Sequence, residues 1–375
     1  KVIIDHRDAK YTLGQFIWTG TDYIGEPTPY SSKNSYFGQI DTAGFRKDSS
    51  YIYQSAWTDY RDRPMVHLLP YWDFNEGQLI DVKVYSNAPR VELFFNDKSL
   101  GDFKIDHEKG TKLCGHWQVP YKKGCLKAVA YDDKGNIVAT DIQRSFGDAA
   151  AIVLKPDKYE LKADGQDLIF LEISTVDAEG NPVHNANNRV DVEVTGAGRL
   201  VGLDNGDSTD YDQYKGTSRR LFSGKLLAII AARLEPGDIN VKVKSRGIKG
   251  AELKLKAVKG QPNPGITALM ENSLSEPNDE IPLRKIELTN HGVSHFNPEN
   301  TSPRISARLY PENTSYTDIE WKVVTISGIE TNIARVEARG REAVLTALGD
   351  GSFKLRCVSK NGTDHSDIVS ELDFE

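Results

Sequence analysis

Residues 14–30 read GQFIWTGTDYIGEPTPY, and the apolar run at 16–18 is the feature from which the rest of the chain is interpreted. A short apolar run closed on both sides by glycine is typical of a buried strand that opens into a loop. The glycine and proline residues at 20–30 predict that loop. On this pattern alone Trp18 is a core side chain, because most isolated tryptophans in folded proteins are largely buried.

Three further runs follow this stretch: SYFGQIDTAGFRKD at 35–48, YQSAWT at 53–58 and RPMVHLLP at 63–70. Together with residues 14–30 they resemble the end of the (β/α)8 barrel in family 2 glycoside hydrolases of the β-galactosidase type. The resemblance implies that residues 15–19 form the last barrel strand. Too few residues precede this strand to supply the other seven strands of such a barrel.

The resemblance also assigns two substrate-binding residues. Trp18 would supply an aromatic platform for a sugar, and Asp22 would shape the wall of the pocket. Aromatic rings suit sugars because their faces stack on the apolar C–H face of a pyranose while the hydroxyls reach polar neighbours. For Asp22 an alternative of equal weight is an acid that caps the backbone of its own loop.

No catalytic residue is assigned in this chain. Retaining glycosidases need two carboxyl groups about 5 Å apart, and barrel enzymes carry such groups at the ends of different strands. The resemblance implies that both catalytic glutamates lie upstream of residues 15–19. Asp22 and Glu26 share one loop, and a single strand cannot hold them opposite a partner.

The fold class is predicted to be mainly β. A short helix is expected at 51–58, and beyond residue 65 nearly every segment has two-residue periodicity closed by turn residues, which is typical of antiparallel sandwiches. In the first sandwich, Asn96-Asp97 predicts a hairpin turn. The strands of that sandwich are expected near residues 79–86, 90–95, 116–119, 125–131 and 136–144.

The domain organisation is therefore three serial immunoglobulin-like antiparallel β-sandwiches, preceded by the last strand and helix of a barrel. The barrel remnant is expected at 1–66 and the first sandwich at 67–147. The second, immunoglobulin-like, is expected at 148–260. A linker rich in proline, asparagine, serine and acids follows at 261–282, and the last sandwich, at 283–375, resembles bacterial immunoglobulin-like modules.

Composition excludes several function classes. The 375 residues include 47 Lys and Arg and 54 Asp and Glu, giving a net charge of −7, so the chain offers no basic surface for nucleic acid. No apolar run approaches the 18 residues or so of a membrane span. Localisation stays open between secreted and cytoplasmic, with a bacterial origin implied by the resemblance.

The three cysteines match neither a disulfide framework nor a metal site. Cys114 and Cys125 could face each other across a hairpin, but free thiols are the commoner outcome. A group of acids and an asparagine offers oxygen atoms of the kind that calcium prefers, although its spacing matches no calcium loop and a solvated turn is favoured. No metal or cofactor is assigned. The members of that group are Asp204, Asn205, Asp207, Asp210 and Asp212.

Two functions follow from these observations. The first is the C-terminal accessory or scaffold region of a retaining β-galactosidase, whose full-length form would hydrolyse terminal β-linked galactosides or oligosaccharides, with sandwiches that could mediate homo-oligomer contacts. The alternative is a non-catalytic carbohydrate-binding or cell-surface adhesion module. Tyr211, Tyr214 and Tyr316, in polar loop-like segments, are candidate glycan contacts, although tyrosine is common on sandwich loops.

The first 66 residues distinguish these two functions. In an enzyme fragment the apolar side chains of this segment would have belonged to a larger core, and a binding module has no reason to carry them. They would then pack on the neighbouring sandwich, exchange with another chain or stay exposed. The side chains concerned are Phe16, Ile17, Trp18, Tyr36 and Phe37.

Overall fold

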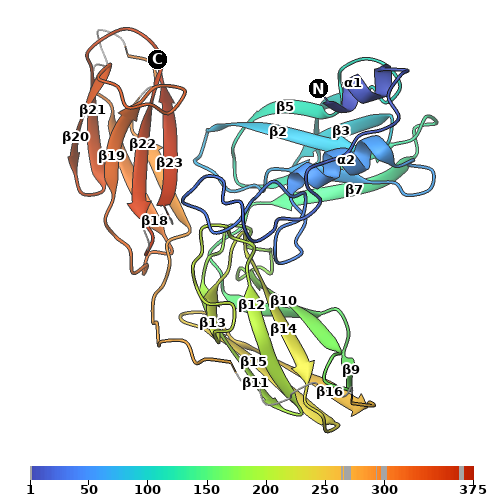
Figure 1. The fold of residues 1–375 in the computed structure, drawn as a ribbon. Helices are drawn as coiled ribbons and strands as arrows, with labels where there is room; N and C mark the ends of the chain where they lie inside the picture. The colour runs from blue at the N-terminus through green and yellow to red at the C-terminus, as the bar shows by residue number, and fades with distance from the viewer. Residues whose placement is uncertain (1, 263–264, 266–271, 293, 297–301, 363–366) are drawn as a thin grey trace. The chain divides into compact units, whose positions relative to one another are not determined.

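The structure is a computed structural model that describes residues 2–262, 265, 272–292, 294–296, 302–362 and 367–375. Strands make up most of its regular structure, and both helices lie near the N-terminus (Figure 1). This confirms the mainly β fold class. The chain forms two compact units, an N-terminal unit at Lys1–Phe146 and a C-terminal unit at Gly147–Glu375. The finer division into five segments stays a prediction.

Helix α2 (Asp48–Trp57) corresponds to the helix expected at 51–58, but it begins three residues earlier. Its N-cap residue is Lys47, which makes no capping hydrogen bond with its side chain. Asp48 is instead in the first turn, where a carboxylate is favourable to the helix dipole, and it contacts His67 Nε2 at 2.8 Å. The other helix, α1 (Val2–Asp8), has no buried residue.

Residues 15–19, expected to be the last barrel strand, do not form a strand. Phe16 is fully exposed in this segment, and Ile17 is half-buried. The physical reason is that a strand is completed by the hydrogen bonds of its neighbours, and among the described residues no strand pairs with this segment. Without such a partner the sequence pattern of a buried strand yields irregular backbone.

The N-terminal unit contains two antiparallel sheets. The expected strands are confirmed to within one residue at each end, and Asn96 and Asp97 occupy the left-handed region, with φ of 45° and 64°, at the predicted turn between Phe95 and Lys98. One sheet has the order β1 (Val66–Leu69), β2 (Leu79–Ser86), β5 (Gly115–Pro120); the other has the order β4 (Lys98–Lys104), β3 (Arg90–Phe95), β6 (Cys125–Tyr131), β7 (Ile137–Arg144).

The core between these sheets is built from alternate strand residues, such as Val82 and Val84 on β2 and Val91 and Leu93 on β3. Trp72 is its largest buried side chain. The indole Nε1 donates a hydrogen bond to the Lys122 carbonyl oxygen at 2.9 Å, so the ring is buried without an unsatisfied polar atom.

The C-terminal unit begins with a second pair of sheets. Ile169, Leu171 and Ile173 of one sheet are buried, as is the alternate set Ile239 and Val241 of the other. The first sheet has the order β12 (Gly198–Asp204), β14 (Lys225–Ala232), β10 (Leu168–Val176), β8 (Ala151–Pro156); the second has the order β13 (Ser218–Arg220), β11 (Arg189–Gly196), β15 (Gly237–Ser245), β16 (Ala251–Lys259), β9 (Glu160–Ala163).

A third pair of sheets follows in the same unit. Its core contains Phe353 and Phe374, whose rings stack with centroids 5.5 Å apart. One sheet has the order β17 (Lys285–Asn290), β18 (Arg304–Tyr310), β21 (Glu342–Ala347), β20 (Ala334–Arg339); the other has the order β19 (Glu320–Val324), β22 (Phe353–Lys360), β23 (Asp367–Phe374).

The expected linker at 261–282 lies partly outside the described residues, which resume at 272. From there to residue 282 the backbone has no helix or strand. Ser275 Oγ accepts hydrogen bonds from the backbone N–H groups of Thr217 and Ser218 at 2.9 and 3.0 Å. This part of the linker is therefore bound to the second pair of sheets, although its composition alone would not order it.

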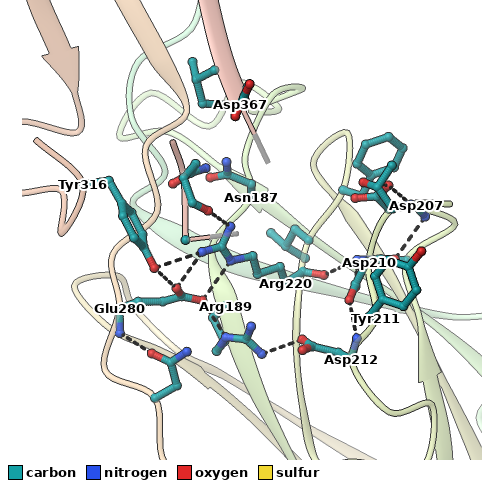
Figure 2. A pocket seen from close by; sticks show the side chains of 18 residues that line it. Asn187, Arg189, Asp207, Asp210, Tyr211, Asp212, Arg220, Glu280, Tyr316 and Asp367 are labelled. Carbon is teal, nitrogen blue, oxygen red and sulfur yellow. Dashed lines mark hydrogen bonds and ion pairs between the residues drawn. The ribbon is translucent and has the colours of Figure 1, made fainter. Parts of the chain in front are cut away.

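Glu280 makes the strongest of these linker contacts. Its carboxylate accepts hydrogen bonds from Arg189 Nε at 2.6 Å, from Arg220 Nε at 2.8 Å and Nη2 at 2.6 Å, and from the Tyr316 hydroxyl. The side chain is only 7% exposed. Burial alone would raise the pKa of Glu280, but the hydrogen bonds from Arg220, Tyr316 and Arg189 outweigh it and lower the pKa to about 2. Figure 2 shows the three donors converging on this carboxylate.

All three cysteines are free thiols, so Cys114 and Cys125 do not form a disulfide. Cys357 is buried on β22, and burial raises the pKa of its thiol to about 12. Within the described parts of the chain, neither helix is long and apolar enough to cross a lipid bilayer.

Replacing Trp72 by alanine is expected to lower the free energy of unfolding of the N-terminal unit by about 3–5 kcal/mol, because it leaves a cavity in the core. Urea unfolding of the purified chain measures this. Trp57→Ala is the control, since Trp57 is 51% exposed at the end of α2, and it should change stability by less than about 1 kcal/mol. An equal loss in both variants would contradict the assignment of Trp72 to the core.

Glu280→Gln is expected to destabilise the C-terminal unit in a pH-dependent way. Because the pKa of Glu280 falls from an ordinary 4.5 to about 2 on folding, ionised Glu280 contributes about 3 kcal/mol at pH values above 4.5. That contribution is lost as the pH falls through the interval from 4.5 to about 2, so the wild-type and variant stabilities should converge there.

Calorimetry of both chains between pH 7 and pH 2.5 tests this expectation, with Glu235→Gln as the matched control because Glu235 is exposed on the same unit. A stability difference between wild type and Glu280→Gln that does not change with pH would be inconsistent with an ionised, hydrogen-bonded carboxylate.

Candidate functional site

The first candidate site is an exposed aromatic loop made of Trp18, Tyr23 and Glu26. Trp18 is 76% exposed, and its indole Nε1 donates a hydrogen bond to the Tyr23 hydroxyl at 3.3 Å. The two rings meet edge to face, with centroids 6.5 Å apart. The Tyr23 hydroxyl in turn donates to the Glu26 carboxylate. A hydrogen bond therefore links the Trp18 ring to Tyr23, and Tyr23 to Glu26, while most of the ring stays open to solvent.

Asp22 lies on the same loop but points into the protein, and only 1% of its side chain is exposed. Its Oδ1 accepts hydrogen bonds from the Gly38 N–H at 2.7 Å and from Lys47 Nζ at 2.8 Å, while Oδ2 lies 2.7 Å from the same ammonium group. The carboxylate thus joins the loop to residues 38 and 47. This geometry corresponds to the alternative reading of Asp22 as a loop cap.

Gly38 is required for this arrangement. A Cβ atom at position 38 would lie 2.2 Å from the Asp22 backbone nitrogen, far inside van der Waals contact. Asp22 N–H also donates to the Ile40 carbonyl oxygen at 2.8 Å. The close approach of these two backbone segments fixes the base of the aromatic loop.

The sequence singled out Trp18 and Asp22 but missed the contact of Trp18 with Tyr23 and Glu26. A tyrosine and a glutamate three residues apart in a loop carry no periodic pattern that would predict their pairing. The structure brings Trp18 together with these two residues, whereas Asp22 faces Lys47.

Large apolar side chains surround the aromatic loop along the chain and remain exposed. Such a concentration of exposed apolar residues is uncommon on a soluble monomer. Ile17, expected to belong to this set, is half-buried. The exposed members are Tyr11, Leu13, Phe16, Trp18, Ile24, Tyr30, Tyr36, Phe37 and Trp57.

The second candidate site is a pocket of about 500 Å³ in the C-terminal unit. Tyr211 and Tyr316, two of the three tyrosines considered as glycan contacts, line it. Tyr214 does not line it; the guanidinium carbon of Arg219 lies 4.7 Å from the centroid of its ring.

Three of the acids considered as calcium ligands, Asp207, Asp210 and Asp212, line the same pocket, whereas Asp204 does not; the three are bound by protein groups. Asp210 Oδ2 accepts a hydrogen bond from Arg219 Nε at 2.9 Å, and Asp212 Oδ2 accepts one from Arg189 Nη1 at 2.8 Å. Asp207 Oδ1 accepts from the Thr209 N–H at 2.8 Å. Among the residues that the structure describes, no group of three or more His, Cys, Asp or Glu side chains is arranged to hold a metal ion.

Two protein families match parts of this chain. Residues 152–254 match the family described as glycoside hydrolase family 2 C-terminal domain 5. Residues 77–139 match a domain of unknown function, DUF4982. These ranges correspond to the second pair of sheets and to most of the first.

Similar curated proteins are glycosidases. β-Galactosidase BoGH2A of Bacteroides ovatus is 41% identical over 254 residues, a match that covers 67% of this chain and 29% of that protein. A β-glucuronidase of Formosa agariphila is 25% identical over 250 residues, covering 62% of this chain and 23% of that protein. The chain thus spans less than a third of the length of either relative.

A solved structure supports the same relationship. The crystal structure of a β-glycosidase from Bacteroides vulgatus superposes with a TM-score of 0.59 at 35% identity, covering 64% of this chain and 30% of that one. Family, relatives and fold therefore agree: the chain belongs to glycoside hydrolase family 2, to whose C-terminal region it corresponds.

Proposed function

We propose that this chain is the accessory C-terminal region of a retaining β-galactosidase that hydrolyses terminal β-galactosides. The galactoside follows the name of the Bacteroides ovatus relative, which is 41% identical, while Formosa relatives of up to 35% identity carry names of β-glucuronidases. The catalytic glutamate pair would lie in a part of the enzyme outside this chain, and the sandwiches would act as scaffold.

The observation that carries the proposal is the exposed Trp18 ring, which is hydrogen-bonded to Tyr23 and belongs to a segment rich in exposed apolar side chains. In the full-length enzyme the rest of the barrel would cover most of this apolar surface. Phe16, which is fully exposed here, would then be part of a core, and residues 15–19 would gain the neighbours that a strand requires.

Trp18 would contribute to catalysis by positioning the substrate. A pyranose presents an apolar C–H face that stacks on an indole, while its hydroxyls reach polar groups at the edge of the ring. Because Tyr23 and Glu26 fix the orientation of the indole, the sugar would be held at a defined angle to the catalytic carboxyl groups. Asp22 would act on this site through the loop that it anchors to Lys47.

Hydrolysis of a chromogenic β-galactoside tests where the catalytic groups lie. The 375-residue chain is expected to be inactive, because a retaining mechanism needs two carboxyl groups about 5 Å apart, and a longer protein extended upstream through the whole barrel is expected to be active. Activity of the 375-residue chain itself would mean that the catalytic carboxyl groups lie within it and would refute the proposal.

Trp18→Ala in the longer protein tests the aromatic platform. We expect kcat/KM for the β-galactoside to fall at least tenfold, which corresponds to about 1.4 kcal/mol of lost transition-state stabilisation. Tyr159→Ala, which removes a 62% exposed aromatic side chain of the C-terminal unit, should leave kcat/KM within about twofold, a difference of less than about 0.5 kcal/mol. Unchanged kinetics in Trp18→Ala would exclude Trp18 from the substrate site.

A further inference from the structure

The pocket in the C-terminal unit has no role in the function proposed above, and its lining residues are suited to a ligand of their own. One wall comes from the segment after β12 and from the loop after β13, which carry Asp207, Tyr211 and Phe222. The other wall comes from the described linker residues and from the third pair of sheets, which carry Glu280 and Tyr316. Its volume of about 500 Å³ falls within the range of pockets that hold small organic ligands.

The floor of the pocket is held in place by charged hydrogen bonds. Arg220 donates to Glu280 and, through Nη1, to the Asn361 carbonyl oxygen at 2.6 Å. Arg189 donates to Glu280 and to Asp212. Figure 2 shows Arg220 between Tyr316 on one side and Asp210 on the other. The two walls therefore share buried, charge-assisted contacts, and such contacts preorganise a site.

The charges of the lining residues restrict the kind of ligand. Five carboxylates line the pocket, and the two arginines among the lining residues already donate to two of them. An anionic ligand would meet an excess of negative charge. Ionised carboxylates only accept hydrogen bonds, so the pocket suits a ligand rich in hydroxyl donors. The carboxylates are those of Asp207, Asp210, Asp212, Glu280 and Asp367.

The aromatic residues of the pocket add an apolar contact. Tyr211 is 61% exposed and Phe222 is 43% exposed, and both line the pocket on the wall opposite Tyr316. Exposed aromatic rings next to carboxylates suit a pyranose, because its C–H face can stack on a ring while its hydroxyls donate hydrogen bonds to the carboxylates. A metal ion or small cation would use the acids but would gain no stacking from the rings and would be repelled by the two arginines.

We propose that this pocket binds a neutral oligosaccharide, with Tyr211 and Phe222 stacking on sugar rings and the carboxylates of Asp207 and Asp212 accepting hydrogen bonds from hydroxyls. The site is built by the C-terminal unit alone. It does not depend on Trp18 or on the catalytic activity proposed above, and it would hold a glycan at a point other than the hydrolytic site.

The test is a glycan array that carries neutral oligosaccharides of galactose, glucose, mannose and xylose beside acidic oligosaccharides of galacturonic and glucuronic acid. The 375-residue chain is expected to bind neutral glycans. The neutral oligosaccharide with the strongest signal is then titrated by calorimetry into the chain and its variants. Tyr211→Ala and Phe222→Ala should each weaken binding at least tenfold.

A control separates this site from the rest of the surface. Tyr159→Ala removes a tyrosine of nearly equal exposure, 62%, elsewhere on the second pair of sheets, and this variant should bind as the wild type does. Spermine, a polycation that would use the carboxylates alone, is titrated in parallel. The proposal is overturned if no neutral glycan binds, if only acidic glycans bind, or if spermine binds and no glycan does. Full binding by both pocket variants would overturn it as well.

Discussion

The carboxylate of Glu280 is the contact on which the arrangement of the C-terminal unit depends. A buried carboxylate is costly unless donors replace the water that it loses, and here two guanidinium groups and a phenol do so. The three donors come from β11, β13 and the segment before β19. One side chain of a segment without regular structure therefore ties together two pairs of sheets and closes one side of the pocket.

Much of the fold could be predicted from the sequence because it is encoded locally. The strand at 90–95 alternates inward and outward residues, and Asn96 and Asp97 tolerate the left-handed backbone that a tight hairpin turn needs. The contacts of Glu280 could not be predicted in this way, because Arg220 and Arg189 lie 60 and 91 residues away in the sequence. Nothing in a local pattern pairs charges across such separations.

The prediction of a strand at 15–19 was wrong for a related reason. An apolar run between two glycines is typical of a buried strand. A buried strand needs neighbouring strands, and none of the described strands pairs with residues 15–19. For the candidate site, the sequence singled out Trp18 and Asp22 but not their contacts. Trp18 contacts Tyr23, whereas Asp22 contacts Lys47. The role proposed for Trp18 comes from the resemblance to a family, and composition and periodicity could not have supplied it.

Because Gly38 lies so close to Asp22, the base of the aromatic loop tolerates substitution much less than its exposed tip does. At position 38 any side chain would collide with backbone, so the base of the loop has almost no freedom to vary during evolution. The ring of Trp18, by contrast, projects from that base into solvent and contributes little to folding. Mutation can therefore exchange the group presented at the tip without rebuilding its support.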